Sequence, residues 1–562
     1  RDASGLVCER RLTIDDFSFV RDHQIGCPPS ARDPNLLALP VIPFAVSMEI
    51  VAEAAAALVD GSHKVVQLTE CRGYRWLAFD QGTLSLRITA KMEAAGVAHV
   101  RIFEMTTAEG KETQFLAFEG KAHFAESYPP APAPQVFEDE AFLAPNYTKD
   151  MLYGAPRHRR YAPMFHGPKF QAVRGIRRWN SRRIEADLVA LSTDNFCRED
   201  GAAPAFEVDP VLIDAASHLI AYWAGERFGV DLSSFPFAAL DYRQYAPAPR
   251  SGETIRCRVT IDVRAPDGRP TAFEVLNNEG SVISRMPCAE ATRYDDPPPY
   301  DFCRLDPADA ILDANFEFLD QSGRVIATLT GWQDRYFTMP HRLYRCRLWP
   351  QTEYFSDPWM QEETGMVCRR VGGAENGFLE DAWGIWKRVL ASLALSEPER
   401  RLWYALPAKG ARRAEWLLGR IAAKDAVRQW AEQKYDIRLA PADVQILPDR
   451  LDRPYVVSQA LSALGPVPQV SITHSNGRIV AAASEPDKPL GIDLVRRDSV
   501  RSPEHVGRSF SDSELKLAGG TANGVLTFWS AREAAAMALG EGLGGEPRDW
   551  IVDDFCKEDG AV

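Results

Sequence analysis

A histidine stands in a short polar segment just ahead of a strongly apolar one. Residues 22–26 read Asp-His-Gln-Ile-Gly, so His23 follows a strand-like run and precedes a run that predicts a buried helix. An imidazole can act as a general base near neutral pH. Backbone N–H groups at a helix start can stabilise an oxyanion. Taken alone, His23 also fits a histidine in a surface loop.

A second pair of groups has helical spacing. Asp214 and His218 are four residues apart, so they share one face of the helix predicted over 208–227. A carboxyl among apolar residues has a raised pKa, which makes a protonated acid available. An Asp near a helix start also favours the helix dipole, which is the plainer interpretation.

Two carboxylates form a third candidate near the C-terminus. Asp493 ends a short apolar run, Leu-Gly-Ile-Asp, and Glu533 lies in Trp-Ser-Ala-Arg-Glu-Ala-Ala, which opens a predicted helix. Carboxylates from two elements can share Mg²⁺, which prefers oxygen ligands and substrate phosphates. A strand-end Asp and a helix-surface Glu are the alternative.

The elements that must position the first two candidates occur twice. Residues 44–58 predict an apolar, buried helix, and residues 208–227 predict a second helix. Strands are predicted around the first helix at 83–90, 97–104 and 113–124, and around the second at 253–263, 271–276, 314–319 and 324–337. The Pro-rich run 129–134 reads as a linker between the halves. We therefore expect an α+β fold in which a sheet wraps round a central helix, made twice.

The remainder predicts a separate α+β unit of roughly 200 residues. Helices are expected at 378–396, 411–434 and 527–543, with a hairpin at 469–474 and 478–483 and a further strand at 488–495.

Composition limits the class of protein. The chain has 562 residues, 45% of them hydrophobic and 25% charged, as in ordinary globular proteins. Its net charge of −13 argues against a general nucleic-acid binder, and no apolar stretch predicts a membrane span. The ten Cys form no Cys-x-x-Cys pair, which favours a reducing cytoplasm. The first residue is Arg1, which suggests a piece of a longer protein.

Three segments form a specific set. They are Asp-His-x-x-Gly at 22–26 with Leu-Pro-Val-Ile-Pro-Phe-Ala-Val-Ser-Met-Glu at 39–49, Met-Phe-His-Gly-Pro-Lys-Phe-Gln at 164–171, and Asp-Ala-Ala-Ser-His at 214–218. As a set they resemble the dehydratase domain of an iterative type I polyketide or polyunsaturated fatty acid synthase, a double hotdog fold. The resemblance implies one hotdog at 1–132 and a second at 133–345. In one departure, 19 residues separate His23 from Pro43, an insertion that resembles the enediyne-type synthases.

The resemblance also implies a reaction, the loss of water from a β-hydroxyacyl thioester. His23 would remove the α-proton, and Asp214, held by His218, would protonate the hydroxyl. The substrate tunnel would be lined by Tyr153, His166, Gly167 and Pro168.

The C-terminal unit resembles a two-lobed 4′-phosphopantetheinyl transferase of the surfactin-synthetase-activating type. The similar segments are Gly-Ile-Asp at 491–493, Trp-Ser-x-x-Glu-Ala at 529–534, Ser-Ile-Thr-His-Ser at 471–475 and the basic helix at 412–424. The resemblance covers 370–562, after a linker at 346–369. It implies that Asp493 and Glu533 bind Mg²⁺ and that Glu533 helps to deprotonate a carrier serine. The implied contacts to coenzyme A are Arg413, Arg420, Lys424, His474 and Arg532.

This second resemblance has departures. Arg532 stands where the family usually has Lys, Met537 replaces a second Lys, and Val495 replaces a common Glu. Arg keeps the charge of Lys but changes its geometry.

Partners follow from both resemblances. Residues 157–183 hold nine Lys or Arg and no Asp or Glu, which fits either a solvated basic face or a docking site for an acidic acyl carrier domain or its phosphate. We expect a cytoplasmic, membrane-free part of a polyketide synthase that works with upstream domains, homodimerises and modifies a carrier in the synthase or in trans. The alternative is a non-catalytic scaffold that shapes chains and docks carriers, with a degenerate transferase domain.

Overall fold

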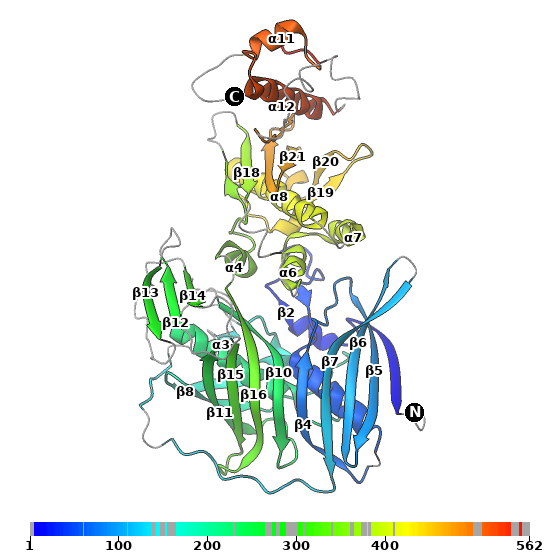
Figure 1. The fold of residues 1–562 in the computed structure, drawn as a ribbon, viewed down its shortest axis with the longest axis vertical. Coiled ribbons are helices and arrows are strands. Elements are labelled where there is room, and N and C mark those ends of the chain that lie inside the picture. The colour runs from blue at the N-terminus through cyan, green and yellow to red at the C-terminus, as the bar shows by residue number, and fades with distance from the viewer. Residues whose placement is uncertain are drawn as a thin grey trace. The chain divides into compact units, whose positions relative to one another are not determined.

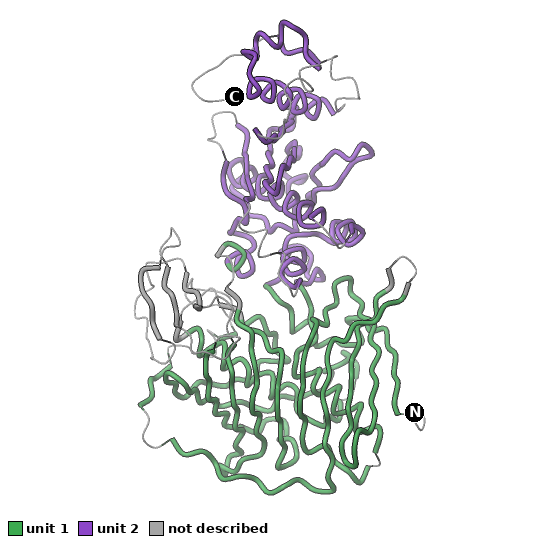
Figure 2. Tube along the Cα trace, viewed as in Figure 1, with its two compact units in different colours: residues 1–26, 39–344 green, residues 27–38, 345–562 purple. Residues whose placement is uncertain are grey.

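A computed structural model gives the fold. It describes residues 5–59, 61–108, 111–137, 141–145, 152–153, 164–201, 203–228, 232–264, 272–276, 282–287, 302–306, 311–338, 341–359, 365–372, 379, 384–407, 411–497, 509–540 and 550–553. The chain forms two compact units, which Figure 2 colours separately. Unit 1 comprises residues 1–26 and 39–344, and unit 2 comprises 27–38 and 345–562. No described helix has the length and apolar character needed to cross a membrane.

The first half of unit 1 is a sheet packed on one helix. Its helix α1 (Phe44–Ala56) is apolar on most faces and lies against strands β4 to β7. The other elements are β1 (Leu6–Thr13), the 3-10 helix η1 (Ser18–Asp22), β2 (Gln24–Ile25), β3 (Leu39–Pro40), β4 (Lys64–Gly73), β5 (Thr83–Ala94), β6 (Val97–Ala108) and β7 (Lys111–Ala125). The strands predicted at 83–90, 97–104 and 113–124 are thus confirmed.

The second half repeats the arrangement around α3 (Pro210–Phe228). Asp209 and Pro210 explain where α3 begins, because Oδ1 of Asp209 accepts from the N–H groups of Val211 and Leu212, both at 3.0 Å, and proline suits the first helical position. The surrounding elements are η2 (Pro168–Phe170), β8 (Val173–Trp179), β9 (Arg183–Val189), β10 (Leu232–Gln244), β11 (Thr254–Arg264), β15 (Ile311–Leu319) and β16 (Val325–Thr338). Strands β12 (Ala272–Leu276), β13 (Val282–Pro287) and β14 (Phe302–Asp306) form a small separate sheet.

The two halves share one sheet. Eleven strands run in the order β1-β5-β6-β7-β4-β10-β16-β15-β11-β9-β8, and Figure 1 shows them side by side. Antiparallel pairing of β4 with β10 makes the junction, with Ala239 opposite Cys71 and Tyr242 opposite Leu68. We expected two sheets, each round its own helix. The difference arises because β4 and β10 would otherwise be exposed edge strands. Pairing them gives hydrogen-bond partners to the backbone N–H and C=O groups of both edges.

Unit 2 is built on the long helix α8 (Arg412–Tyr435). This helix packs on a four-stranded sheet of order β17-β18-β22-β21. Its strands are β17 (Asp357–Pro358), β18 (Val367–Val371), β21 (Gln469–Ser475) and β22 (Arg478–Ser484), and β19 (Gln445–Pro448) pairs with β20 (Pro454–Val457). Its other described helices are α6 (Ile385–Ala394), α7 (Glu397–Ala405), η3 (Pro441–Asp443), α9 (Gln459–Ser462), α11 (Asp512–Leu517) and α12 (Ala522–Leu539), and the division between the units falls within α4 (His341–Leu348). Residues 346–369, expected as a linker, contribute β17 and part of β18 to this unit.

The prediction of a strand at 488–495 is wrong. Among its residues the structure describes no strand. Side chains of β21 take the place of a backbone ladder, because Ser471 Oγ accepts from Ile492 N at 3.2 Å and Thr473 Oγ1 accepts from Leu494 N at 3.1 Å.

A short excursion of the chain, residues 27–38, belongs to unit 2 although unit 1 holds both of its ends. The carboxylate of Asp443 accepts from Ser30 Oγ and, at 3.3 Å, from Ala31 N. Arg400 Nη2 donates to the carbonyl of Leu37 at 2.7 Å. The insertion that lengthens the His23 motif is therefore an ordered part of unit 2.

Candidate active site

His23 directly follows η1 and is buried, with 7% of its surface exposed. Its Nδ1 lies 2.9 Å from the carbonyl oxygen of Val41, and the N–H of Val41 donates back to the carbonyl of His23 at 3.1 Å. A carbonyl only accepts, so Nδ1 carries the proton and Nε2 presents a lone pair. Burial lowers the pKa of His23, while the charge of Asp214 opposes that shift. The neutral ring is therefore the form suited to accept a proton.

Asp214 and His218 lie on one face of α3, as their spacing predicts. His218 Nε2 is 3.1 Å from Asp214 Oδ2, and His218 Nδ1 is 2.9 Å from the hydroxyl of Tyr153. That hydroxyl accepts from Val173 N at 3.3 Å, so its own hydrogen is available for Nδ1. His218 then donates from Nε2 to Asp214. This chain of three side chains fixes the orientation of the carboxylate.

His166 joins the two halves of the site. Its backbone forms an antiparallel bridge with His23, and Gly167 N donates to the carbonyl of Asp22 at 2.7 Å. His166 Nε2 lies 3.6 Å from Asp214 Oδ2, and its ring centroid lies 3.8 Å from that of His218 and 4.9 Å from that of His23. Burial, with smaller contributions from the neighbouring histidines, lowers the pKa of His166 well below its usual value. His166, assigned from the sequence to a substrate tunnel, lies among the candidate catalytic groups.

Tyr153, Gly167 and Pro168 were the other tunnel residues. Tyr153 contacts His218, and burial raises its pKa. Gly167 packs on Asp22, and Pro168 opens η2 directly after it. The structure thus gathers these positions around His166 and His218. Part of the basic segment, residues 157–163, lies outside the described residues.

Sequence reasoning passed over two acidic residues. Glu49, in the middle of α1, is 3% exposed and accepts from the N–H groups of Glu207 and Val208, both at 2.8 Å, just ahead of α3. Burial raises the pKa of Glu49 to about 9. Asp22 is partly buried, which raises its pKa, and its carboxyl group accepts a hydrogen bond from the backbone N–H of Lys169. The visible signal for Glu49 was a carboxyl group in the apolar first part of the helix, three to five residues after Phe44, Ala45 and Val46.

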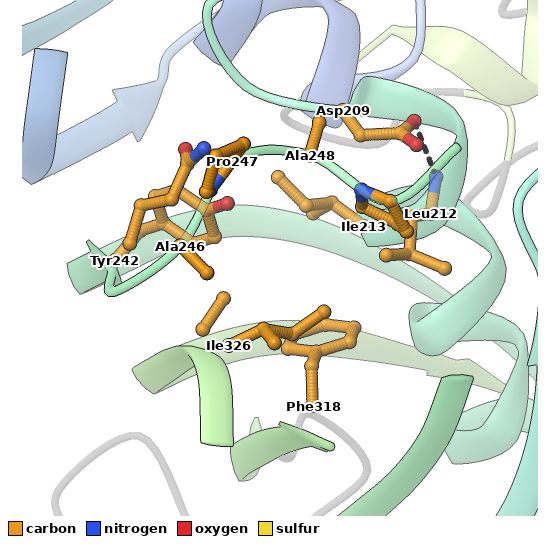
Figure 3. Close-up of a pocket in the computed structure, with 12 residues that line it drawn as sticks. Asp209, Leu212, Ile213, Tyr242, Ala246, Pro247, Ala248, Phe318 and Ile326 are labelled. Carbon is orange, nitrogen blue, oxygen red and sulfur yellow. Dashed lines mark hydrogen bonds between the residues drawn. The ribbon is translucent and has the colours of Figure 1, made fainter. Parts of the chain in front are cut away.

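A small pocket lies beside the start of α3. Its walls are mostly apolar and include Leu212, Ile213 and Phe318. Figure 3 shows these side chains with Asp209, whose carboxylate is hydrogen bonded to Leu212. Neither Asp214 nor His218 lines this pocket.

The segments of unit 2 that carry Asp493 and Glu533 also come together. Asp493 receives a hydrogen bond from Thr473 Oγ1 at 3.3 Å, and its carbonyl receives one from Ser530 Oγ of α12 at 3.3 Å. Burial, and secondly the charge of Asp493, raises the pKa of Glu533. Gly491 explains the close approach, because a Cβ there would lie 1.8 Å from the carbonyl oxygen of Ala534. The Gly-Ile-Asp motif thus lets this segment lie directly against α12.

Two cations expected to bind coenzyme A have interior partners instead. Lys424 is fully buried and donates to Glu399 at 2.6 Å and to the carbonyls of Ala394 and Pro441. Arg532 is 2% exposed, pairs with Glu514 and donates to the carbonyl of Ser509 at 2.7 Å. In this structure both act in packing, because a buried charge needs a local partner.

The other expected contacts differ in exposure. His474 is exposed at the end of β21. Arg413 donates to the carbonyls of Tyr404 and Leu406. Arg420 lies over the ring of Trp416 at 4.6 Å, and burial lowers its pKa. Of the five, His474 is the one best placed to meet a ligand from solvent.

Comparisons with known proteins concern the dehydratase resemblance. No curated protein matches the chain. Similar solved structures include the dehydratase domain of the CurJ module of curacin polyketide synthase, with 11% identity and a TM-score of 0.40 over 60% of this chain and 93% of that one. A trans-AT polyketide synthase dehydratase domain from Brevibacillus brevis has 14% identity and a TM-score of 0.38 over 59% and 94%. The dehydratase domain of a mycocerosic acid synthase-like polyketide synthase has 14% identity and a TM-score of 0.36 over 58% and 90%. Residues 137–299, which carry His166, Asp214 and His218, match the family model described as polyketide synthase dehydratase N-terminal domain.

Proposed function

We propose that unit 1 is a dehydratase of the polyketide synthase type, which converts a carrier-bound β-hydroxyacyl thioester into the α,β-unsaturated thioester. The observation that carries this proposal is the convergence of His23 with Asp214, from opposite halves of the unit, within one buried cluster. The match of residues 137–299 to the dehydratase family supports it.

The geometry suits an elimination in which two groups handle protons. Nε2 of His23 takes the α-proton, the C–O bond breaks as the double bond forms, and the hydroxyl leaves as water with the proton of Asp214. His218 holds Asp214 in place. The first N–H groups of α1, which starts just after Val41, are suited to stabilise the thioester oxyanion. One proton then passes from His23 back to Asp214 before the next turnover.

A dehydration assay with a β-hydroxyacyl N-acetylcysteamine thioester tests this function. Loss of general acid or base catalysis should slow His23→Ala or Asp214→Asn by roughly 10²–10⁴-fold. His99→Ala is the control, because this histidine of β6 pairs with Glu119 outside the cluster. Unchanged rates in the first two variants would refute the assignment.

For unit 2 we propose Mg²⁺-dependent transfer of 4′-phosphopantetheine from coenzyme A to a serine of an acyl carrier domain. The packing of the Asp493 segment on the helix that carries Glu533 supports this proposal, since repulsion between the two carboxylates would be relieved by a shared cation. They would hold Mg²⁺, which would neutralise charge on the diphosphate. Glu533 would receive the proton of the serine hydroxyl as its oxygen bonds to the β-phosphorus, and the bond from that phosphorus to the leaving adenosine 3′,5′-bisphosphate breaks.

A second candidate for unit 2 is carrier docking without catalysis. The interior pairing of Lys424 and Arg532 favours it, because it leaves fewer cations for phosphates. Mass spectrometry of an apo carrier incubated with coenzyme A and Mg²⁺ separates the two. A mass gain that Asp493→Asn abolishes supports transfer. No gain with any carrier of the synthase supports docking.

A further inference from the structure

We propose that His23, His166 and Asp214 form a binding site for a divalent transition metal of the zinc type, and that metal bound there blocks the dehydratase. One side-chain ligand atom from each residue lies within 4.8 Å of the other two, and all three side chains are buried. Within the described residues no other such group of three His, Cys, Asp or Glu occurs.

The three residues are ready to act as ligands. His23 already has the arrangement usual for a metal-binding imidazole, with one nitrogen donating to a backbone carbonyl and the other bearing a lone pair. Asp214 has an outer partner in His218, which orients the carboxylate.

His166 supplies the second observation. Its Nδ1 is buried and has no hydrogen-bond partner among the residues that the structure describes. Its Nε2 lies 3.6 Å from Asp214 Oδ2, beyond ordinary hydrogen-bond length. Burying an imidazole nitrogen without a hydrogen-bond partner lowers the stability of the folded state. A metal ion bound to Nε2 would give this ring a strong interaction on the side that faces Asp214, while Nδ1 would keep its present surroundings.

Distances and ligand chemistry select the class of metal. Ligands about 2.0–2.1 Å from zinc in a tetrahedral site are about 3.3–3.4 Å apart. The separation of His166 from Asp214 is close to that, and side-chain rotation closes the wider gaps. Two imidazoles with one carboxylate suit Zn²⁺, Ni²⁺ or Co²⁺ better than Mg²⁺ or Ca²⁺. Three protein ligands leave a fourth position for water.

Inhibition of dehydration by the metal rests on the proposed function, whereas metal binding itself does not. A bound metal would use the lone pair of His23 and the carboxylate of Asp214, the two groups assigned to proton transfer. Binding is therefore measured spectroscopically, apart from activity.

The experiment titrates Co²⁺ into the chelator-treated full chain and records its visible absorption. We expect one equivalent to give the intense spectrum of a four-coordinate site, and Zn²⁺ to displace it. His166→Phe and His166→Gln should each weaken binding by at least the roughly 10–100-fold that loss of an outer-shell partner costs. The partly buried pair His99–Glu119 lies outside this cluster and supplies a control, since His99→Ala should leave the spectrum unchanged.

Circular dichroism shows whether each His166 variant is folded. One folded variant is enough for the cobalt titration. Absence of a one-equivalent four-coordinate spectrum, or its persistence in a folded His166 variant, would overturn the site. If Co²⁺ binds as expected but the metal-free chain does not dehydrate the thioester, the proposed function fails and the metal site stands. If it dehydrates and Zn²⁺ leaves the rate unchanged, the inhibition is wrong.

Discussion

Gly167 lies so close to Asp22 that a Cβ on the glycine would be 2.0 Å from Oδ1 of the aspartate. The two residues flank His166 and His23, whose backbones form a bridge. This contact between the end of η1 in the first half and the residue just before η2 in the second limits how near the two histidines can come.

Gly167→Ala should therefore reduce dehydration strongly, because the added methyl group must push the two loops apart. We expect the free energy of unfolding to fall by roughly 1–3 kcal/mol, the usual cost of overpacking. We also expect kcat to fall when it is measured at a temperature well below the Tm of the variant. Gly175→Ala is the matched control, since no atom lies within 4 Å of its added Cβ. Equal behaviour of the two variants would contradict this account.

Tyr153→Phe should slow dehydration while leaving the fold intact. The variant removes the hydroxyl that holds Nδ1 of His218, and leaving a buried partner unsatisfied costs about 1–3 kcal/mol, or roughly 5–150-fold in rate if it all affects the transition state. Measurement of kcat and KM separately checks it. Tyr245→Phe, which loses only a contact with Thr328, should retain the wild-type rate.

The stability of unit 1 should fall as pH rises from about 5 towards 9, because the pKa of Glu49 is raised from 4.5 to about 9 on folding. In this window the folded state holds a proton that the unfolded state has lost, so the free energy of unfolding decreases with pH. The slope from this one group is at most about 1.4 kcal/mol per pH unit. Urea unfolding at pH 6 and 8.5 should show a shallower change for Glu49→Gln, and an equal slope would rule out Glu49 as its source.

Gly491→Ala should abolish carrier modification and metal binding by unit 2. The new methyl group would collide with the carbonyl of Ala534 and move Asp493 away from Glu533. Calorimetric titration with Mg²⁺ and the carrier mass assay both report on this change. Gly372→Ala provides the control, because open space surrounds its added Cβ, and a functional Gly491→Ala protein would disprove the need for close approach.

Lys424→Met should destabilise unit 2 far more than the double variant Lys424→Met/Glu399→Gln. Breaking a buried ion pair costs about 3–5 kcal/mol because one charge is left unpaired, whereas the amide of Gln is neutral and keeps an oxygen that can accept from the N–H of Ile446. Chemical unfolding of the full chain measures the difference. If Lys424 instead contacts coenzyme A, the single variant should unfold normally and raise the KM for coenzyme A.

The amino-acid sequence by itself determined the elements and the candidate residues. Apolar periodicity identified α1, α3, α8 and most strands, because the spacing of apolar residues within one short segment distinguishes a helix from a strand. The same pattern placed Asp214 and His218 on one helix face.

Tertiary structure decided which of these meet. The approach of His23 to His166 and Asp214, the joining of β4 to β10 and the assignment of residues 27–38 to unit 2 all depend on contacts distant in the chain. Lys424 and Arg532 have the positive charge expected of residues that bind phosphate, and only their buried partners Glu399 and Glu514 reveal a structural role. Charge and spacing are visible along a chain, whereas the free energy of burying a charge depends on the partner that folding brings to it.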